Sequence, residues 1–188
     1  KKNLRALIQA EIAREVDRLI GRIVGREQAP RDLEATEMAI RASMHEIGAV
    51  VLGQLLQVDP GERAARVACG RGHEAVFVEQ RTKAVQTVLG SLTIRRAYYH
   101  CGSCRDGVIP RDAELDIVGT SFSPGVRRLM SRLGGKEAFD EAREDLEALA
   151  GIVVQTKQVE RVSEAIGEQI EAIHRKERKA ALAGKVVL

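Results

Sequence analysis

Two short groups of cysteine and histidine constrain the fold of this chain more than any other part of its sequence. The first is Cys69-Gly-Arg-Gly-His73 and the second is Cys101-Gly-Ser-Cys104, and a stretch rich in β-forming residues separates them. Together they contain every cysteine of the chain. Soft ligands in close pairs, each on a tight turn, are typical of a tetrahedral structural zinc site that draws two turns together. The sequence therefore predicts a zinc site formed by Cys69, His73, Cys101 and Cys104.

The same residues leave alternatives to this zinc site open. Arg71 and Gly72 fill the positions that a C-x-x-C pair would use, so free thiols beside an exposed histidine are one alternative. A disulfide is disfavoured because three cysteines leave one thiol over. His100 adjoins Cys101 and competes with His73 as the fourth ligand. We favour His73, because adjacent residues on a strand point to opposite faces of a sheet.

The residues around these ligands predict a small sheet. Runs of β-forming residues cover 75–78, 85–89 and 92–99, and Gly90-Ser91 is a suitable two-residue hairpin turn between the last two runs. Such a sheet has almost no core of its own, so the binding energy of zinc would become its folding energy. We therefore expect residues 61–118 to form a zinc-ribbon-like β module with structural zinc.

The amino-terminal part of the chain predicts two long helices. Apolar residues recur at steps of three and four between residues 3 and 24 and again from Leu33 to Leu56, with a break at 25–30. A short connection between two such helices favours an antiparallel hairpin. Neither helix can bury its apolar stripe alone in water. We therefore expect residues 1–60 to serve assembly and the protein to be a homo-oligomer.

The last part of the chain predicts three further helices. Ser123-Pro124 is a good helix start, glycines interrupt the pattern at 134–135 and 151, and a last helix begins near Thr156. Three helices with a glycine-containing connection before the last match a helix-turn-helix arrangement, which we expect over residues 119–188. A plain three-helix bundle with solvated charges is the alternative. In a helix-turn-helix unit the first turn of the last helix faces the DNA major groove, and here it offers Lys157, Gln158 and Arg161.

Together these parts predict an α+β fold that is mostly helical. The 188 residues carry a net charge of only +3, which does not by itself indicate a nucleic-acid-binding protein. Basic residues are nevertheless clustered, and such clusters either contact phosphate or lie on solvated helix faces. The clusters are Arg127, Arg128, Arg132 and Lys136, and then Arg175, Lys176, Arg178 and Lys179.

The location of the protein follows from what the sequence lacks. No segment reaches the length of a membrane span, and the residue order of a secretion signal is missing. We therefore expect a cytoplasmic protein without a membrane partner, in a reducing compartment that favours metal binding over disulfides. The first residue is not methionine, so we also expect the chain to be part of a longer protein.

A series of motifs runs through the middle and end of the chain. The strongest stretch is 81–90, followed by Ile94-Arg95-Arg96-Ala97-Tyr98-Tyr99-His100-Cys101. The series continues with Cys104, Gly107, Pro110 and Asp112, and then with 123–125, 150–152 and 159–161. In this order the motifs resemble the amino-terminal region of bacterial insertion-sequence transposases of the ISKra type. The resemblance covers residues 66–172, and its most specific part is the segment R-A-Y-Y-x-C-x-x-C.

This resemblance implies a protein that binds the ends of a mobile DNA element and helps to move it. In this family a ribonuclease-H-like nuclease domain with two magnesium ions follows the region, so we expect magnesium only there and no catalytic carboxylate in this chain. Related members commonly read C-x-C-G-H at the first zinc arm. This chain keeps Cys69, Gly72 and His73 but has Arg71 in place of the inner cysteine, which makes His73 the fourth ligand.

Our leading hypothesis is the DNA-binding and assembly region of a DNA transposase, without its catalytic domain. In this hypothesis the three-helix unit contacts the bases of double-stranded DNA and the amino-terminal helices hold protomers together. The β module contacts backbone phosphates through Arg81, Lys83, Arg95 and Arg96. The alternative is a zinc-stabilised protein-interaction adaptor with no sequence-specific DNA binding, an interpretation that the near-neutral net charge keeps open.

Overall fold

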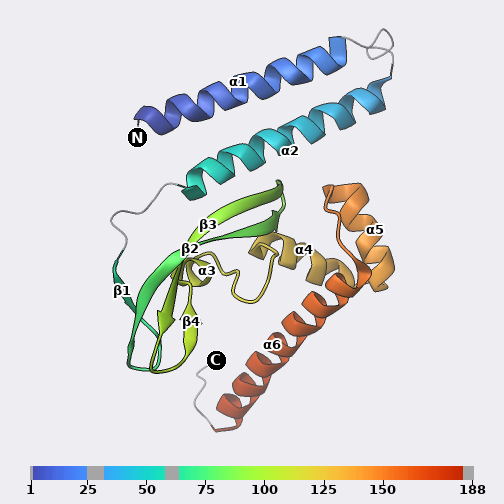
Figure 1. Ribbon diagram of the computed structural model, residues 1–188. Helices are drawn as coiled ribbons and strands as arrows, with labels where there is room; N and C mark the ends of the chain where they lie inside the picture. The colour runs from blue at the N-terminus through green and yellow to red at the C-terminus, as the bar shows by residue number, and fades with distance from the viewer. Residues whose placement is uncertain (1, 25–31, 58–63, 184–188) are drawn as a thin grey trace. The chain divides into compact units, whose positions relative to one another are not determined.

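The computed structural model describes residues 2–24, 32–57 and 64–183 (Figure 1). They form an α+β fold divided into two compact units, Lys1–Ser123 and Pro124–Leu188. The predicted break at 25–30 lies outside the described residues, as does the predicted boundary between 60 and 61. Among the described residues, no helix combines the length and the apolar character needed to cross a membrane.

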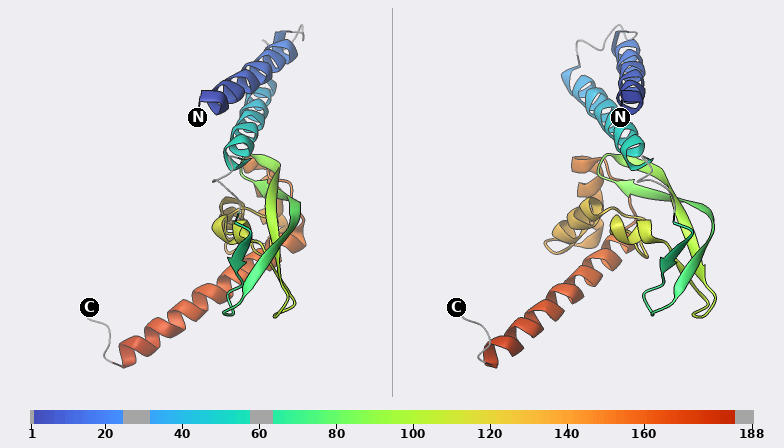
Figure 2. Two further views of the ribbon diagram at one scale, coloured as in Figure 1. Left: turned by 60° about the vertical axis from the view of Figure 1, so that its left-hand side comes forward. Right: turned by 90° about the vertical axis from the view of Figure 1, so that its left-hand side faces the viewer.

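Two long helices open the first unit, as the apolar periodicity predicts. They are α1 (Lys2–Val24) and α2 (Leu33–Gln57), and they lie side by side and antiparallel in Figures 1 and 2. Asp32 starts α2, because its side-chain Oδ1 accepts a hydrogen bond from the backbone N–H of Ala35 at 3.0 Å. Glu15 of α1 and Ser43 of α2 are buried. The first unit therefore begins with the predicted helical hairpin.

A four-stranded antiparallel sheet follows, in the order β1-β2-β3-β4. Its strands are β1 (Arg66–Ala68), β2 (Glu74–Thr87), β3 (Gly90–Cys101) and β4 (Asp106–Val108). The β-forming runs at 75–78 and 85–87 belong to one long strand, β2. The long hairpin of β2 and β3 dominates the sheet (Figure 1).

The turn of this hairpin lies two residues earlier than the sequence predicts. Thr87 pairs with Gly90, so the turn residues are Val88 and Leu89 and not Gly90-Ser91. Thr87 explains this placement, because its hydroxyl accepts the N–H of Leu89 at 3.2 Å and donates to the carbonyl of Gly90 at 2.8 Å. Gly90 still has the left-handed φ of 125° that glycine tolerates best.

A β-bulge divides the long hairpin into two halves that bury opposite faces. The register of β2 shifts between Phe77 and Glu79, whereas β3 keeps its alternation. Near the cysteines the buried residues include Tyr99, which packs edge-on against Phe77 with ring centroids 5.8 Å apart. Near the turn they are Val85 and Ile94, which lie on the other face. Each half therefore has a small core of its own.

The core of the turn half is closed by a short helix that the sequence did not predict, α3 (Pro110–Glu114), and by Ile117. Asp112 of α3 is buried and accepts a hydrogen bond from Arg96 Nη1 at 2.7 Å. Its Oδ2 also accepts one from Lys83 Nζ at 3.3 Å, and the same ammonium donates to the carbonyl of Ile117 at 2.6 Å. These charge-assisted hydrogen bonds hold α3 against the strands.

Helix α2 packs against the turn of the hairpin, which joins the predicted helical and β parts into one compact unit. A Cβ atom at Gly48 would lie only 3.1 Å from Leu89. Near the end of α2, Arg111 Nη2 donates to the carbonyl of Leu56 at 3.3 Å. The helical hairpin is therefore attached to the β module through the second half of α2.

The second unit contains the three predicted helices, α4 (Pro124–Gly134), α5 (Phe139–Ala150) and α6 (Thr156–Leu182). Gly151 ends α5 in a left-handed conformation with φ of 65°, and its N–H donates to the carbonyl of Glu147 at 2.9 Å. All three helices and the α5–α6 connection contribute to one core, namely Val126, Met130, Ala142, Leu146, Ile152, Val154 and Val159.

Candidate metal centre

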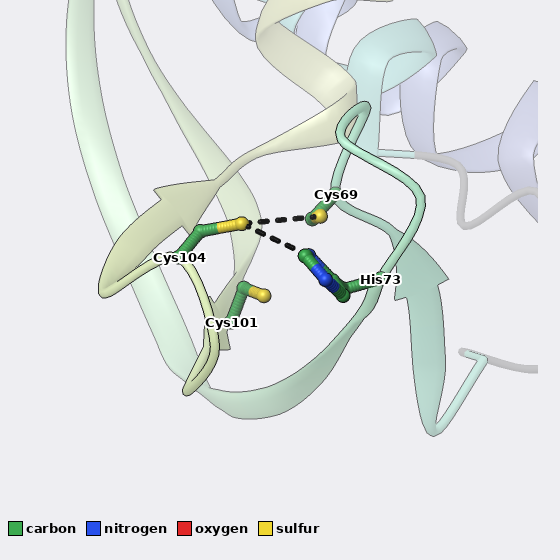
Figure 3. Close-up of side chains that lie close together, drawn as sticks. All are labelled: Cys69, His73, Cys101 and Cys104. Carbon is green, nitrogen blue, oxygen red and sulfur yellow. Dashed lines mark hydrogen bonds between the residues drawn. The ribbon is translucent and has the colours of Figure 1, made fainter.

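The two ligand groups lie at the same end of the sheet, each in the turn of a separate hairpin. Residues 69–73 connect β1 to β2, and residues 102–105 connect β3 to β4. Val76 near the start of β2 pairs with His100 near the end of β3, so the two turns are neighbours. Figure 3 shows the four side chains converging from these turns.

Glycines shape the first turn. Gly70 and Gly72 have φ of 78° and 81°, a left-handed conformation that residues with a Cβ adopt at a cost. The turn closes where the backbone N–H of Cys69 donates to the carbonyl of His73 at 2.9 Å. The sequence Cys-Gly-Arg-Gly-His therefore folds so that its first and last side chains meet.

The ligand atoms lie at distances that suit a single metal ion. The three Sγ atoms and one histidine nitrogen all lie within 4.8 Å of one another. Cys69 Sγ and Cys104 Sγ are 3.7 Å apart, and His73 Nδ1 is 3.3 Å from Cys104 Sγ (Figure 3). Tetrahedral zinc with bonds of about 2.3 Å to sulfur places two sulfurs about 3.8 Å apart. Cys69, His73, Cys101 and Cys104 could therefore hold a metal ion such as zinc, and their predicted proximity is confirmed.

The surroundings of the thiols differ. Cys101 is fully buried, whereas Cys69 and Cys104 are half-buried, and all three are free of disulfides. Hydrogen bonds from the backbone at Arg71, and then at His73, lower the pKa of the Cys69 thiol to about 6. Burial, and then the neighbouring Cys101 and Cys69, raise the pKa of the Cys104 thiol to about 11. A divalent cation would favour the thiolate form of all three.

His100 does not belong to this cluster. It is exposed, whereas its neighbours Tyr99 and Cys101 on β3 are buried. The alternation of the strand therefore directs His100 away from the sulfur atoms, as the sequence argument predicts. His73 is the histidine in the cluster.

An ion pair that the sequence analysis did not predict connects the two turns. Arg71 Nη2 lies 3.4 Å from Asp106 Oδ2 on β4, and both side chains are mostly exposed. A pair of this kind contributes at most about 1 kcal/mol. Arg71 lies in the first turn, and its charge pairs with a carboxylate beside the second turn.

The basic residues predicted to contact phosphate on the β module have different environments. Arg96 and Lys83 point into the core of the turn half, where both bind Asp112. Arg81 stacks on the ring of Tyr98, 3.5 Å from its centroid. Arg95 is exposed. Because Lys83 and Arg96 pair with the carboxylate of Asp112 inside the protein, we do not include them in the proposed DNA-binding surface.

The residues predicted to contact DNA from the last helix lie in the first two turns of α6. Lys157 and Arg161 are exposed and one turn apart, and Lys157 Nζ binds Glu160 at 2.6 Å. Gln158 caps the helix instead, because its Oε1 accepts the backbone N–H of Gln155 at 2.9 Å. On α4 the remaining predicted residues differ in exposure: Arg128 and Arg132 are exposed and Arg127 is half-buried.

Comparisons with known proteins do not assign this chain to a family. The chain matches no protein-family model, no curated protein and no solved structure.

Proposed function

We propose that this chain is the DNA-binding and assembly region of a DNA transposase, built around a structural zinc ion. The observation that carries the proposal is the cluster of Cys69, His73, Cys101 and Cys104, whose ligand atoms lie within 4.8 Å of one another. Four protein ligands fill all positions of a tetrahedral zinc ion, which is the pattern of structural sites. In this proposal zinc therefore stabilises the fold and takes no part in catalysis.

The small cores of the β module explain why it needs zinc. Beside the cysteines the buried core consists of Ala75, Tyr99 and Cys101. Such a core is too small to offset the conformational entropy of four ordered strands. Metal binding supplies the missing free energy, because the site forms only in the folded state.

The second unit supplies the DNA contacts in this proposal. Lys157 and Arg161 occupy the start of α6, where a helix-turn-helix unit presents its side chains to the major groove. Arg128 and Arg132 on α4 are exposed and suit phosphate contacts. Helix α5 carries Asp140, Glu141 and several other acidic residues, so it would stay away from the phosphates.

The resemblance to the amino-terminal region of ISKra-type transposases gives these contacts a biological setting. Element ends would be the DNA that is bound, and a following nuclease domain with magnesium would carry out the cleavage. Exposed apolar side chains on the helical hairpin support the assembly role, and they include Leu33, Ile40, Met44 and Leu55. A second copy of the chain would cover them.

The same exposed side chains favour a second candidate function, a zinc-stabilised protein-interaction adaptor. Here α1 and α2 bind a different protein and the basic residues are only solvated. Sedimentation of the chain with and without DNA separates the two candidates. A complex with DNA supports the first, and an unchanged sedimentation rate supports the second.

A binding titration tests the DNA-binding proposal directly. Duplexes from the ends of the encoding element and random duplexes are titrated at two salt concentrations, with one zinc per chain confirmed beforehand. We expect tighter binding to element ends than to random duplexes. Loss of each residue that contacts a phosphate should reduce the slope of log affinity against log salt concentration by about one. Lys157→Ala and Arg161→Ala should weaken binding, and Arg66→Ala on β1 is the matched control. Equal affinity for both duplexes would contradict sequence-specific recognition.

A further inference from the structure

Between the bulge and the turn, β2 and β3 form a two-stranded ribbon with one outward face. Cross-strand pairing places eight residues on that face, which we call the ribbon face: Gln80, Thr82, Ala84, Gln86, Ser91, Thr93, Arg95 and Ala97. None of them is acidic, and Arg95 supplies the single charge. Polar groups that donate and accept hydrogen bonds therefore cover this surface.

The ribbon face is exposed, whereas the opposite face is covered. Thr82 pairs with Arg95 and Ala84 pairs with Thr93, and all four residues are exposed. The alternating residues Val85 and Ile94 are buried against Ile117. The covered face packs on the protein, and the ribbon face remains available for a partner.

The covered face also makes the ribbon stiff. Lys83 and Arg96 project to that side and both bind the buried carboxylate of Asp112. Their hydrogen bonds tie one residue of each strand to α3, and Lys83 reaches the carbonyl of Ile117 as well. A surface fixed in this way loses little conformational entropy when it binds.

The edges of the ribbon are largely free of other strands. Among the described residues, β1 pairs with β2 only at 74–76 and β4 pairs with β3 only at 99–101. The chain at 121–123 accompanies β2 at Gln86, beside the turn. Most of the ribbon is therefore only two strands wide.

We propose that the ribbon face enters the major groove of double-stranded DNA and contacts base edges there. The major groove admits a two-stranded β-ribbon, and arginine binds guanine there through two hydrogen bonds. Arg95 would contact a guanine, and the short side chains of Thr82 and Thr93 would allow the strands to approach the neighbouring bases. The absence of carboxylates on this face removes repulsion from the phosphates.

This inference rests on the proposed DNA binding, but assigns sequence reading to a surface outside the three-helix unit. It also separates Arg95 from the other basic residues of the β module. Arg81 is paired with Glu79 and stacked on Tyr98, whereas Arg95 faces outward among neutral side chains. Arg95 is thus the residue whose loss should affect one base pair specifically.

The test compares Arg95→Ala with Arg66→Ala in the zinc-loaded chain. Both replace an exposed arginine on a strand of the same sheet, and Arg66 lies on β1, outside the ribbon face. The probe is the duplex that the wild-type chain selects from a random-sequence library. Affinity is measured by fluorescence anisotropy, and methylation by dimethyl sulfate reports which guanine N7 atoms in the major groove are protected. Zinc content and circular dichroism confirm that each variant is folded.

We expect Arg95→Ala to lose about 10-fold or more in affinity and to expose one guanine to methylation, whereas Arg66→Ala changes affinity less than about 2-fold. Thr82→Glu, which places a carboxylate on the ribbon face, should weaken binding as well. If the Arg95 variant binds and protects like the Arg66 variant while Lys157→Ala and Arg161→Ala weaken binding, the ribbon inference is wrong and the DNA-binding proposal stands. If the wild-type chain selects no duplex at low salt, both are wrong.

Discussion

The β module and the three-helix unit are stabilised in different ways. Among its described residues, the three-helix unit buries seven apolar side chains in one core, including Met130, Leu146 and Ile152. The β module has two separate cores on opposite faces, with three buried residues each. One of these includes Cys101, which also belongs to the metal site. Packing of apolar side chains stabilises one region, and the proposed zinc ion stabilises the other.

Because they are stabilised differently, the two regions should lose structure under different conditions. Hydrophobic burial in the helical unit depends on packing and not on metal. With the proposed zinc ion, the folding free energy of the β module depends on ligands that must be deprotonated and on an ion that can be removed. Perturbations of the ligands and of the helical core should therefore act separately.

The largest effect is expected from Cys101→Ser. This change removes the fully buried cysteine of the candidate metal cluster, and structural zinc sites contribute roughly 10 kcal/mol or more to folding. We expect loss of bound zinc and collapse of the NMR resonances of residues 66–108, with the signals of α4 to α6 retained. His100→Ser is the matched control, because His100 is exposed on the same strand and lies outside the cluster. A Cys101 variant that retains zinc and dispersed β-strand resonances would contradict this expectation.

Acidification should produce a similar loss without a mutation. The pKa of Cys69 is lowered from 9.0 to about 6, so its thiolate contributes stability above pH 9 that is lost as the pH falls through 6. Bound zinc competes with these protons, so release should occur at or below pH 6. A chromogenic chelator measures released zinc, and circular dichroism follows the helices, which should persist. Zinc release centred above pH 7 would exclude this account.

The converse perturbation is Leu146→Ala in the three-helix unit. Leu146 is almost completely buried on α5, and truncation of such a leucine costs about 2–5 kcal/mol. We expect lower stability of α4 to α6 against urea, with one zinc per chain still bound. The exposed Leu149 on the same helix offers the control, since Leu149→Ala should cost far less. Loss of zinc from the Leu146 variant would show that the two regions fold together.

Local patterns in the sequence predicted most of the helices and the residues of the candidate metal site. The periodicity of apolar residues located α1, α2 and α6, and the helix start at Ser123-Pro124 with the glycines at 134–135 and 151 located α4 and α5. The spacing of cysteine and histidine located the cluster. Tertiary contacts determined the rest. The turn shifted to Val88-Leu89 because the Thr87 side chain bonds to Leu89 and Gly90. The β-bulge between Phe77 and Glu79 placed the following odd-numbered residues of β2 on the opposite face of the hairpin. Asp112 belongs to the motif series but had no role assigned to it, and only the fold places Lys83 and Arg96 against its carboxylate.

The smallest effect is expected within the metal turns, where two glycines differ in conformation. Gly72 in the first turn has φ of 81° with open space around its Cα, whereas Gly102 in the second turn has similar space without the left-handed conformation. Gly72→Ala should therefore cost about 1–2 kcal/mol through backbone strain alone. Because folding and metal binding are coupled, this cost should appear as about a 5- to 30-fold loss of zinc affinity in a competition titration. Gly102→Ala should bind zinc like the wild type. Equal losses of zinc affinity in both variants would mean that steric crowding by the added methyl group, and not the left-handed φ of Gly72, causes the loss.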